Sequence, residues 1–159
     1  MVARLVHVEH VMGTVVSFDI RLDDESRRAA MSAAVAEAVT WLHRVDAVFS
    51  TYRADSQISR LSRAEIALDE CDADVADVLA LCARVGTASR GYFSSTYAGH
   101  LDPTGVVKGW SVQRASELLS AAGSRNHSVN GGGDLQLVGE PEPGRCWQVG
   151  IAHPLHRNM

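Results

Sequence analysis

Six apolar residues recur along the segment 31–49 at spacings of four, three, four, three and four positions. They are Met31, Val35, Ala38, Leu42, Val45 and Phe49. Because an α-helix has about 3.6 residues per turn, this spacing places all six side chains on one stripe, about five turns long. The acidic and polar run Asp23–Ser26 before it favours the N-terminal end of such a helix. The chain is therefore predicted to fold around a long amphipathic helix that buries one stripe.

Apolar and polar residues largely alternate before this helix, between Thr14 and Leu22. It is typical of a strand with one buried face, and the segment 4–8 is its predicted hairpin partner, with a turn near Met12-Gly13. The same reasoning predicts a short helical turn over 56–62, helices over 72–90 and 108–122, and strands over 127–130, 135–138 and 147–151. This order predicts an α+β fold in which helices cover one face of a mostly antiparallel sheet.

Composition excludes several classes of protein. A length of 159 residues favours a single domain with a real core. The net charge of −4 argues against a nucleic-acid partner. No stretch is apolar enough for a signal peptide or a membrane segment. The three cysteines are odd in number and include no Cys-x-x-Cys pair, so we expect a reducing, cytoplasmic location.

The segment Asp102–Gly109 carries the densest chemical signal. Pro103 and Gly105 indicate a turn that leads directly into a helix, and Lys108 is expected in the first turn of that helix. Unpaired backbone N–H groups and a partial positive charge at a helix N-terminus, together with a lysine, suit a pyrophosphate. An ordinary capped helix with a solvated lysine explains the same residues, and the segment is no Walker A loop.

Two further segments have a functional and a structural interpretation. Three consecutive glycines within Asn130–Asp134 indicate either a close backbone approach to a ligand or a tight hairpin. Tyr52 lies in a polar loop after the long helix, where an aromatic ring can stack on a planar ligand or simply be exposed.

Taken in order along the chain, these segments resemble the ApbE family, the FAD-dependent protein FMN transferases. Met12-Gly13-Thr14 is similar to a flavin contact of the family, and Asn130–Asp134 to its Asn-x-Gly-Gly-Asp motif. Four other segments match in the same order: Phe49–Leu61, Gly91–Ser94, Asp102–Leu119, and Trp147–Ile151 with Pro154. The chain departs from the pattern at Ser94, where the family has an acid, and at Gln113 or Arg114, where a second acid is expected.

The resemblance implies an ApbE-like or T-fold-like domain that transfers FMN from FAD to a Thr or Ser hydroxyl of a target flavoprotein, with release of AMP and dependence on Mg²⁺. The resemblance assigns FAD contacts to the following residues: Met12, Tyr52, Tyr92, Phe93, Ser94, Asp102 and Lys108. It also assigns a backbone carbonyl for Mg²⁺ to Gly105. Asp102 and Lys108 would hold the ribityl-pyrophosphate part.

Family members continue with a His-x-x-Asp-Pro segment and acidic residues that supply most Mg²⁺ ligands. We therefore expect residues 1–159 to form only the N-terminal portion of the domain, with the catalytic residues beyond it. Two alternatives follow: a non-catalytic flavin-binding module or inactive fragment that needs a complementing chain, and a pyrophosphatase that splits FAD into FMN and AMP. Nothing in the sequence names the acceptor protein or excludes a homodimer.

Overall fold

The computed structural model describes residues 3–151. The strands of its main sheet are β1 (Ala3–Val11), β2 (Thr14–Leu22), β5 (His127–Gly131) and β6 (Asp134–Val138). Its helices are α1 (Arg28–Phe49), α2 (Gln57–Ser62), α3 (Ala73–Ala88) and α4 (Thr104–Ala121). Short 3₁₀ turns span Glu25–Arg27 and Leu68–Glu70, and a small hairpin pairs β3 (Thr96–Tyr97) with β4 (His100–Leu101). The architecture is α+β, as predicted.

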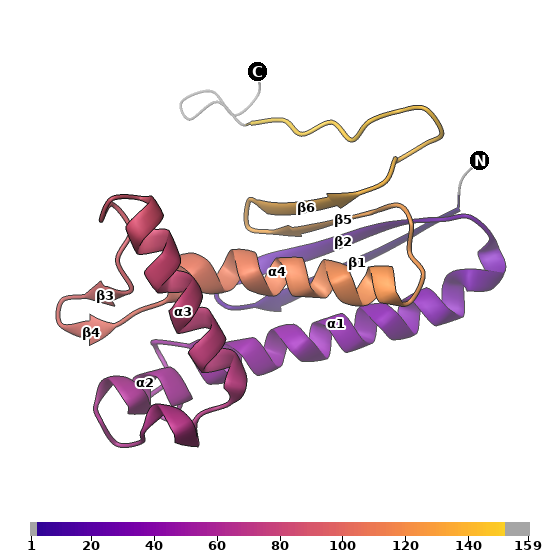
Figure 1. The fold of residues 1–159 in the computed structure, drawn as a ribbon. Helices are drawn as coiled ribbons and strands as arrows, with labels where there is room; N and C mark the ends of the chain where they lie inside the picture. The colour runs from indigo at the N-terminus through magenta and orange to yellow at the C-terminus, as the bar shows by residue number, and fades with distance from the viewer. Residues whose placement is uncertain (1–2, 152–159) are drawn as a thin grey trace.

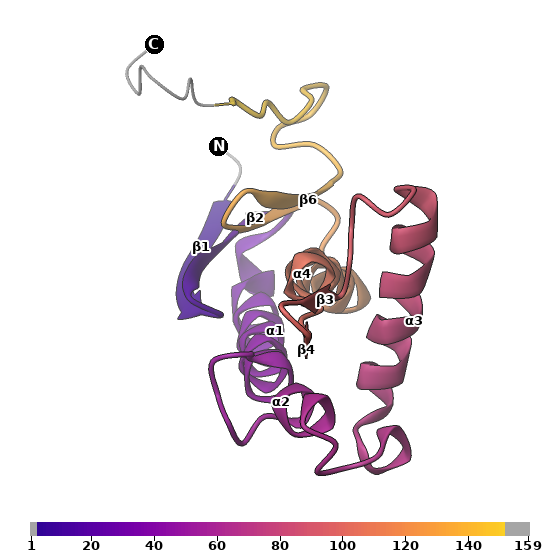
Figure 2. The same ribbon diagram turned by 90° about the vertical axis from the view of Figure 1, so that its left-hand side faces the viewer.

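The main sheet has the strand order β1-β2-β5-β6, and every neighbouring pair is antiparallel. Helices α1 and α4 lie side by side across one face of this sheet, as Figures 1 and 2 show. The opposite face carries no helix of the described chain (Figure 1). The two hairpin turns, β1–β2 and β5–β6, meet at one end because Gly132 donates its N–H to the carbonyl of Val15 over 3.2 Å.

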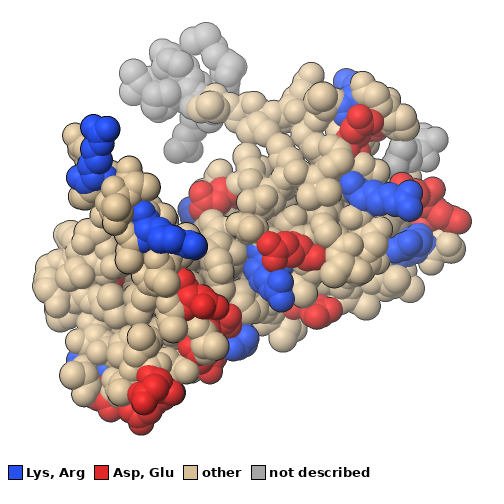
Figure 3. All heavy atoms as spheres, in the orientation of Figure 1, with Lys and Arg blue, Asp and Glu red and all other residues tan. Residues whose placement is uncertain are grey.

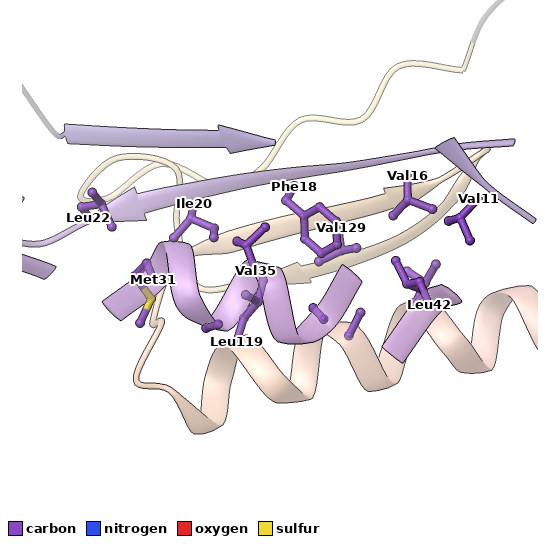
Figure 4. Close-up of a cluster of buried hydrophobic side chains, with 14 residues drawn as sticks. Val11, Val16, Phe18, Ile20, Leu22, Met31, Val35, Leu42, Leu119 and Val129 are labelled. Atoms are coloured by element: carbon purple, nitrogen blue, oxygen red, sulfur yellow. The ribbon is translucent and has the colours of Figure 1, made fainter. Parts of the chain in front are cut away.

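The first core fills the space between the sheet and the two helices (Figure 4). The alternating residues of β2 project into it as predicted, and Phe18 and Ile20 have no exposed surface. The predicted stripe of α1 meets them there, together with buried residues of α4, and Leu42 and Leu119 are fully buried. Side chains that repeat every two residues on a strand and about every 3.6 residues on a helix therefore point into this core, as the sequence pattern indicates.

A second core lies beyond the sheet, among α2, α3 and the ends of α1 and α4 that face them (Figure 2). Val75, Val78 and Cys82 of α3 are buried there, and their spacing of three and four positions is that of one helix face. The prediction that the helices together cover one face of the sheet therefore holds for α1 and α4. Helices α2 and α3 instead pack on those two helices and form a separate layer.

One predicted helix boundary and one predicted strand are wrong, and one pair of strands is new. Helix α4 begins at Thr104, because the Asp102 carboxylate accepts hydrogen bonds from the backbone N–H and the hydroxyl of Thr104. Lys108 consequently lies in the second turn and not in the first. The segment 147–151 is not a strand, and the Pro154 of its motif lies outside the described residues. The β3–β4 hairpin was not predicted from the sequence.

The surface agrees with the composition. Acidic and basic side chains are interspersed on the face shown in Figure 3. Cys71, Cys82 and Cys146 form no disulfide. No helix within residues 3–151 is long and apolar enough to cross a membrane.

Candidate functional site

A cavity of about 430 Å³ opens where the β1–β2 turn, the C-terminal end of α1 and the N-terminal end of α4 converge. Its volume lies within the range of roughly 300–1,000 Å³ that is usual for small-molecule sites. The wall consists of Met12, Gly13, Val45, Asp46, Phe49, Ser50, Thr51, Tyr52, Thr104, Val107 and Lys108. Three of the residues predicted to contact FAD, Met12, Tyr52 and Lys108, are therefore brought to one site.

The β1–β2 turn positions Met12 at this cavity. Met12 and Gly13 both have positive φ angles, 54° and 65°, which is the backbone of a tight two-residue hairpin turn. A left-handed conformation is costly for a residue with a side chain and is often retained at functional sites. The Met12 Sδ lies 3.8 Å from Ser111 Oγ, whose hydroxyl donates to the Lys108 carbonyl over 2.8 Å, so the thioether contacts α4.

The loop that follows α1 presents Tyr52. Ser56 fixes this loop, because its hydroxyl donates to the Ser50 carbonyl over 2.7 Å and accepts from the N–H of Ser59 over 3.1 Å. Ser56 is thus the N-terminal cap of α2 and is itself buried. Tyr52 is 98% exposed although it lines the cavity, so its ring is free to cover a planar ligand at the mouth.

Lys108 joins α4 to the glycine-rich turn. Its Nζ lies 3.3 Å from Asp134 Oδ2 and 3.5 Å from the Gly132 carbonyl. Gly132 and Gly133 have positive φ angles of 58° and 103°, and Asn130 Oδ1 accepts the Gly133 N–H over 2.9 Å. The turn is thus a tight hairpin, and it also anchors the lysine at the cavity. The close approach of this turn to a ligand stays a prediction, because none of the residues 130–134 lines the cavity.

The remaining predicted contacts do not line the cavity. Phe93 packs on the start of α4, close enough that a Cβ at Gly105 would lie 3.0 Å from its ring. The Asp102 carboxylate accepts hydrogen bonds from Thr104, the first residue of the same helix. Tyr92 is 97% exposed, and the Ser94 hydroxyl bonds to the backbone of Thr96. Phe93, Asp102 and Gly105 therefore set the position of α4, and their contacts with a ligand stay a prediction.

Several wall residues were not singled out by sequence reasoning as site residues. Asp46 is the only acid and Lys108 the only base among the described wall residues. Asp46 interrupts the otherwise apolar end of α1 between Val45 and Phe49, which is a signal the sequence contained. Val107 had no such signal, because a buried valine in a helix is the ordinary case.

A magnesium site is not formed by this part of the chain. No group of three His, Cys, Asp or Glu side chains within residues 3–151 is arranged to hold a metal ion. Gly105 lies in the first turn of α4, where a carbonyl ordinarily accepts the N–H four residues ahead. Mg²⁺ requires nearly octahedral oxygen coordination that includes carboxylates, so a single carbonyl does not fit it.

The fold is similar to that of several solved structures. The flavin transferase ApbE from Vibrio cholerae superposes with a TM-score of 0.78 at 18% identity, over 97% of this chain and 65% of that one. The apo flavinyl transferase ApbE from Pseudomonas stutzeri gives a TM-score of 0.79 at 17% identity, over 94% and 66%. An ApbE protein from Thermotoga maritima gives 0.77 at 15% identity, over 98% and 65%.

The chain therefore spans about 65% of the length of these solved proteins. No protein of curated function is similar enough in sequence to give a match. The sequence model of the ApbE family, however, matches residues 12–100 and 97–159, which together include every segment of the wall of the cavity. With this match and the shared fold, the chain belongs to the ApbE family.

Proposed function

We propose that this chain is the FAD-binding part of a flavin transferase that attaches FMN to a target flavoprotein. The observation that carries the proposal is the cavity, because it gathers Met12, Tyr52 and Lys108 from three separate family motifs. The fold of flavin transferases and the family match support the same conclusion. The cytoplasm is the proposed compartment, since all three cysteines are free thiols.

The wall of the cavity divides into an apolar and a charged part. Val45, Phe49 and Val107 are buried and offer the apolar surface that an isoalloxazine ring requires. Tyr52 would stack on that ring at the mouth. Lys108 would carry the pyrophosphate, because an ammonium group is a compact point charge that binds phosphate through charge-assisted hydrogen bonds. Asp46 would repel the pyrophosphate and accept a hydrogen bond from a ribityl hydroxyl or a ring N–H.

The proposed reaction is a phosphoryl transfer. A Thr or Ser hydroxyl of the target protein attacks the FMN phosphorus of FAD, the bond from this phosphorus to the bridging oxygen breaks, and AMP leaves with that oxygen. The hydroxyl proton passes to a base. No residue within 3–151 is assigned as this base, and no step is assigned to Mg²⁺, because the described residues do not fit the ion. The part played here by this chain is to bind and orient FAD.

Flavin titration tests the proposal. We expect the fluorescence of FAD to change when it binds to the chain. FMN should bind more weakly, because it lacks the pyrophosphate. Thr51→Trp should lower the affinity for both FAD and FMN, since it places an indole in the cavity wall. Thr40→Trp is the matched control, because Thr40 is exposed on α1 away from the cavity. Equal affinities for FAD and FMN would exclude the pyrophosphate role of this site.

The two alternative functions give different products. A flavin-binding module binds FAD and leaves it intact even when the whole domain is reconstituted. A pyrophosphatase releases both FMN and AMP into solution, because water replaces the protein hydroxyl. Chromatography of the flavin products, with and without a Thr-containing acceptor, separates both from transfer.

A further inference from the structure

A groove of about 600 Å³ lies where the start of α3 meets α1 and α4, and it opens on the face shown in Figure 3. The two long helices line it with side chains three or four positions apart, which lie on one side of a helix. They are Glu37, Trp41 and Arg44 of α1, and Trp110, Arg114 and Glu117 of α4. The start of α3 adds Asp74 and Asp77. We call these eight residues the helix groove.

Two tryptophan rings are fixed in the helix groove. Trp41 and Trp110 are partly buried and pack edge to face, with their ring centroids 5.1 Å apart. The Trp41 Nε1 donates to the Ser111 carbonyl over 3.2 Å, and the Trp110 ring also lies 5.7 Å from the ring of Phe49. Both indoles are therefore held in place before any partner binds. Tryptophan is among the residues that contribute most at protein interfaces, because its rigid ring offers a large contact area.

Both basic side chains of the helix groove are already neutralised by carboxylates. Arg44 pairs with Asp72 and Asp74 at 3.0 and 3.1 Å, and Arg114 pairs with Glu117 at 3.0 Å. Neither guanidinium group is therefore available to an anionic partner. A nucleic acid or an anionic lipid surface does not fit this groove.

Two acidic side chains of the helix groove keep an unbalanced charge. Glu37 of α1 and Asp77 of α3 are exposed, and neither forms an ion pair with any side chain in residues 3–151. The groove as a whole has four carboxylates against two guanidinium groups, so these two acids carry the excess. A cation that enters the groove gains from both carboxylates and from the face of an indole ring.

The chain itself shows how this groove holds a cation. The Arg44 guanidinium lies 5.8 Å from the centroid of the Trp41 ring while it donates to Asp72 Oδ2 over 3.0 Å. This cation therefore contacts an aromatic ring and a carboxylate together. Trp110, Glu37 and Asp77 supply the same two chemical components in the same groove. No basic side chain of the described chain is paired with either of these two acids.

We propose that the helix groove binds an arginine-rich segment of a partner polypeptide, whose guanidinium groups lie over the indoles and against Glu37 and Asp77. A polypeptide fits better than a small cation, because the two carboxylates belong to different helices and a segment with several cations reaches both. Arginine fits better than lysine, because its planar group stacks on an indole and binds a carboxylate through two N–H groups. The proposal does not rest on flavin binding, since the helix groove and the cavity share no wall residue.

Calorimetric titration tests the proposal. The probes are a short peptide of alternating arginine and glycine, and the same peptide with glutamate in place of arginine. We expect only the arginine peptide to bind, and added salt to weaken its binding. Glu37→Gln/Asp77→Asn should lower its affinity roughly tenfold, because two exposed ion pairs are lost. Asp23→Asn/Asp69→Asn removes two exposed carboxylates outside the groove, and this matched control should lower the affinity less than about twofold.

Thr40→Arg gives an independent check. Thr40 lies in the same groove, three positions after Glu37, so the new guanidinium group pairs with Glu37 and occupies the site from within the chain. The affinity for the arginine peptide should therefore fall in this variant as well. Circular dichroism of each variant verifies that the fold is intact. Flavin titration of the same samples should give unchanged FAD affinity, and it tests the proposed function separately.

Three results would overturn the proposal. The first is equal binding of the arginine and glutamate peptides, or binding of neither. The second is a Glu37→Gln/Asp77→Asn variant that loses no more affinity than the control variant does. The third is free arginine or spermidine that binds as tightly as the arginine peptide, which would identify a site for a small cation and not for a polypeptide.

Discussion

Replacement of Lys108 by alanine separates a ligand role from a structural one. The only ionic partner of Lys108 among the described residues is Asp134, and the two side chains are 38% and 45% exposed. An ion pair this exposed contributes about 0.2–1 kcal/mol, and alanine is the better helix former, so the free energy of unfolding should change by less than about 1 kcal/mol. A charge-assisted hydrogen bond to phosphate contributes roughly 1.5–3 kcal/mol, so FAD affinity should fall about 10- to 150-fold.

The matched control is Arg114→Ala on the same helix. Arg114 also forms an exposed ion pair, with Glu117, but it does not line the cavity. Urea unfolding of both variants without ligand should therefore give similar small changes, while fluorescence titration with FAD should distinguish them. If Lys108→Ala lowers stability by several kcal/mol and leaves FAD affinity unchanged, then the lysine holds the glycine-rich turn and has no phosphate to bind.

Three other outcomes are expected. His127 is fully buried between two serine hydroxyls, and burial lowers its pKa from 6.5 to about 4. Between these pH values the unfolded chain binds a proton at this histidine and the folded chain does not. In urea unfolding the free energy of unfolding should therefore be constant above pH 6.5 and fall by about 3 kcal/mol toward pH 4. A pH-independent curve there would contradict this. Gly131→Ala should lower the free energy of unfolding by about 1–3 kcal/mol, because its Cβ would lie 2.5 Å from a methyl of Val112. Gly109→Ala is the matched control: its Cβ meets no atom within 4 Å, and it should raise the free energy of unfolding by up to about 1 kcal/mol in thermal melts. Finally, residues 1–159 with FAD, Mg²⁺ and a Thr-containing acceptor should give no fluorescent band on a denaturing gel, since no three metal-ligating side chains gather within residues 3–151; a band would show that these residues suffice for catalysis.

Local patterns predicted the elements that bury one regular stripe. The spacing from Met31 to Phe49 predicts α1, and the alternation in 14–22 predicts β2. In both cases one face of the element is buried along its length, so the apolar residues repeat with the period of that element. The β3–β4 hairpin escaped prediction since its two-residue strands expose their side chains and carry no alternation. The segment 147–151 has the alternation of a strand but pairs with nothing within residues 3–151, and pairing cannot be deduced from one strand alone.

Part of the site could be predicted from motifs, and part could not. Met12, Tyr52 and Lys108 were found through their motifs, and the motifs resemble those of a known family. Asp46 was not, because a single acid near the end of a helix is common and only the approach of the β1–β2 turn gives it a cavity to face. The start of α4 was misplaced because Pro103 and Gly105 favour a turn. In the structure the Pro103 carbonyl accepts the N–H groups of Val106 and Val107, so the helix begins earlier, at Thr104.

The wall of the cavity is drawn from positions 12–13, 45–52 and 104–108, which no local segment of the chain can bring together. Contacts this distant form only after the intervening loops have closed, so the cavity exists only in the native state and in no isolated hairpin or helix pair. A ligand held there binds the folded chain and not the unfolded one, and at a concentration 100 times its Kd it adds about 2.7 kcal/mol to the free energy of unfolding. Occupancy will therefore slow amide exchange throughout the sheet and both long helices, far from any atom that the ligand touches.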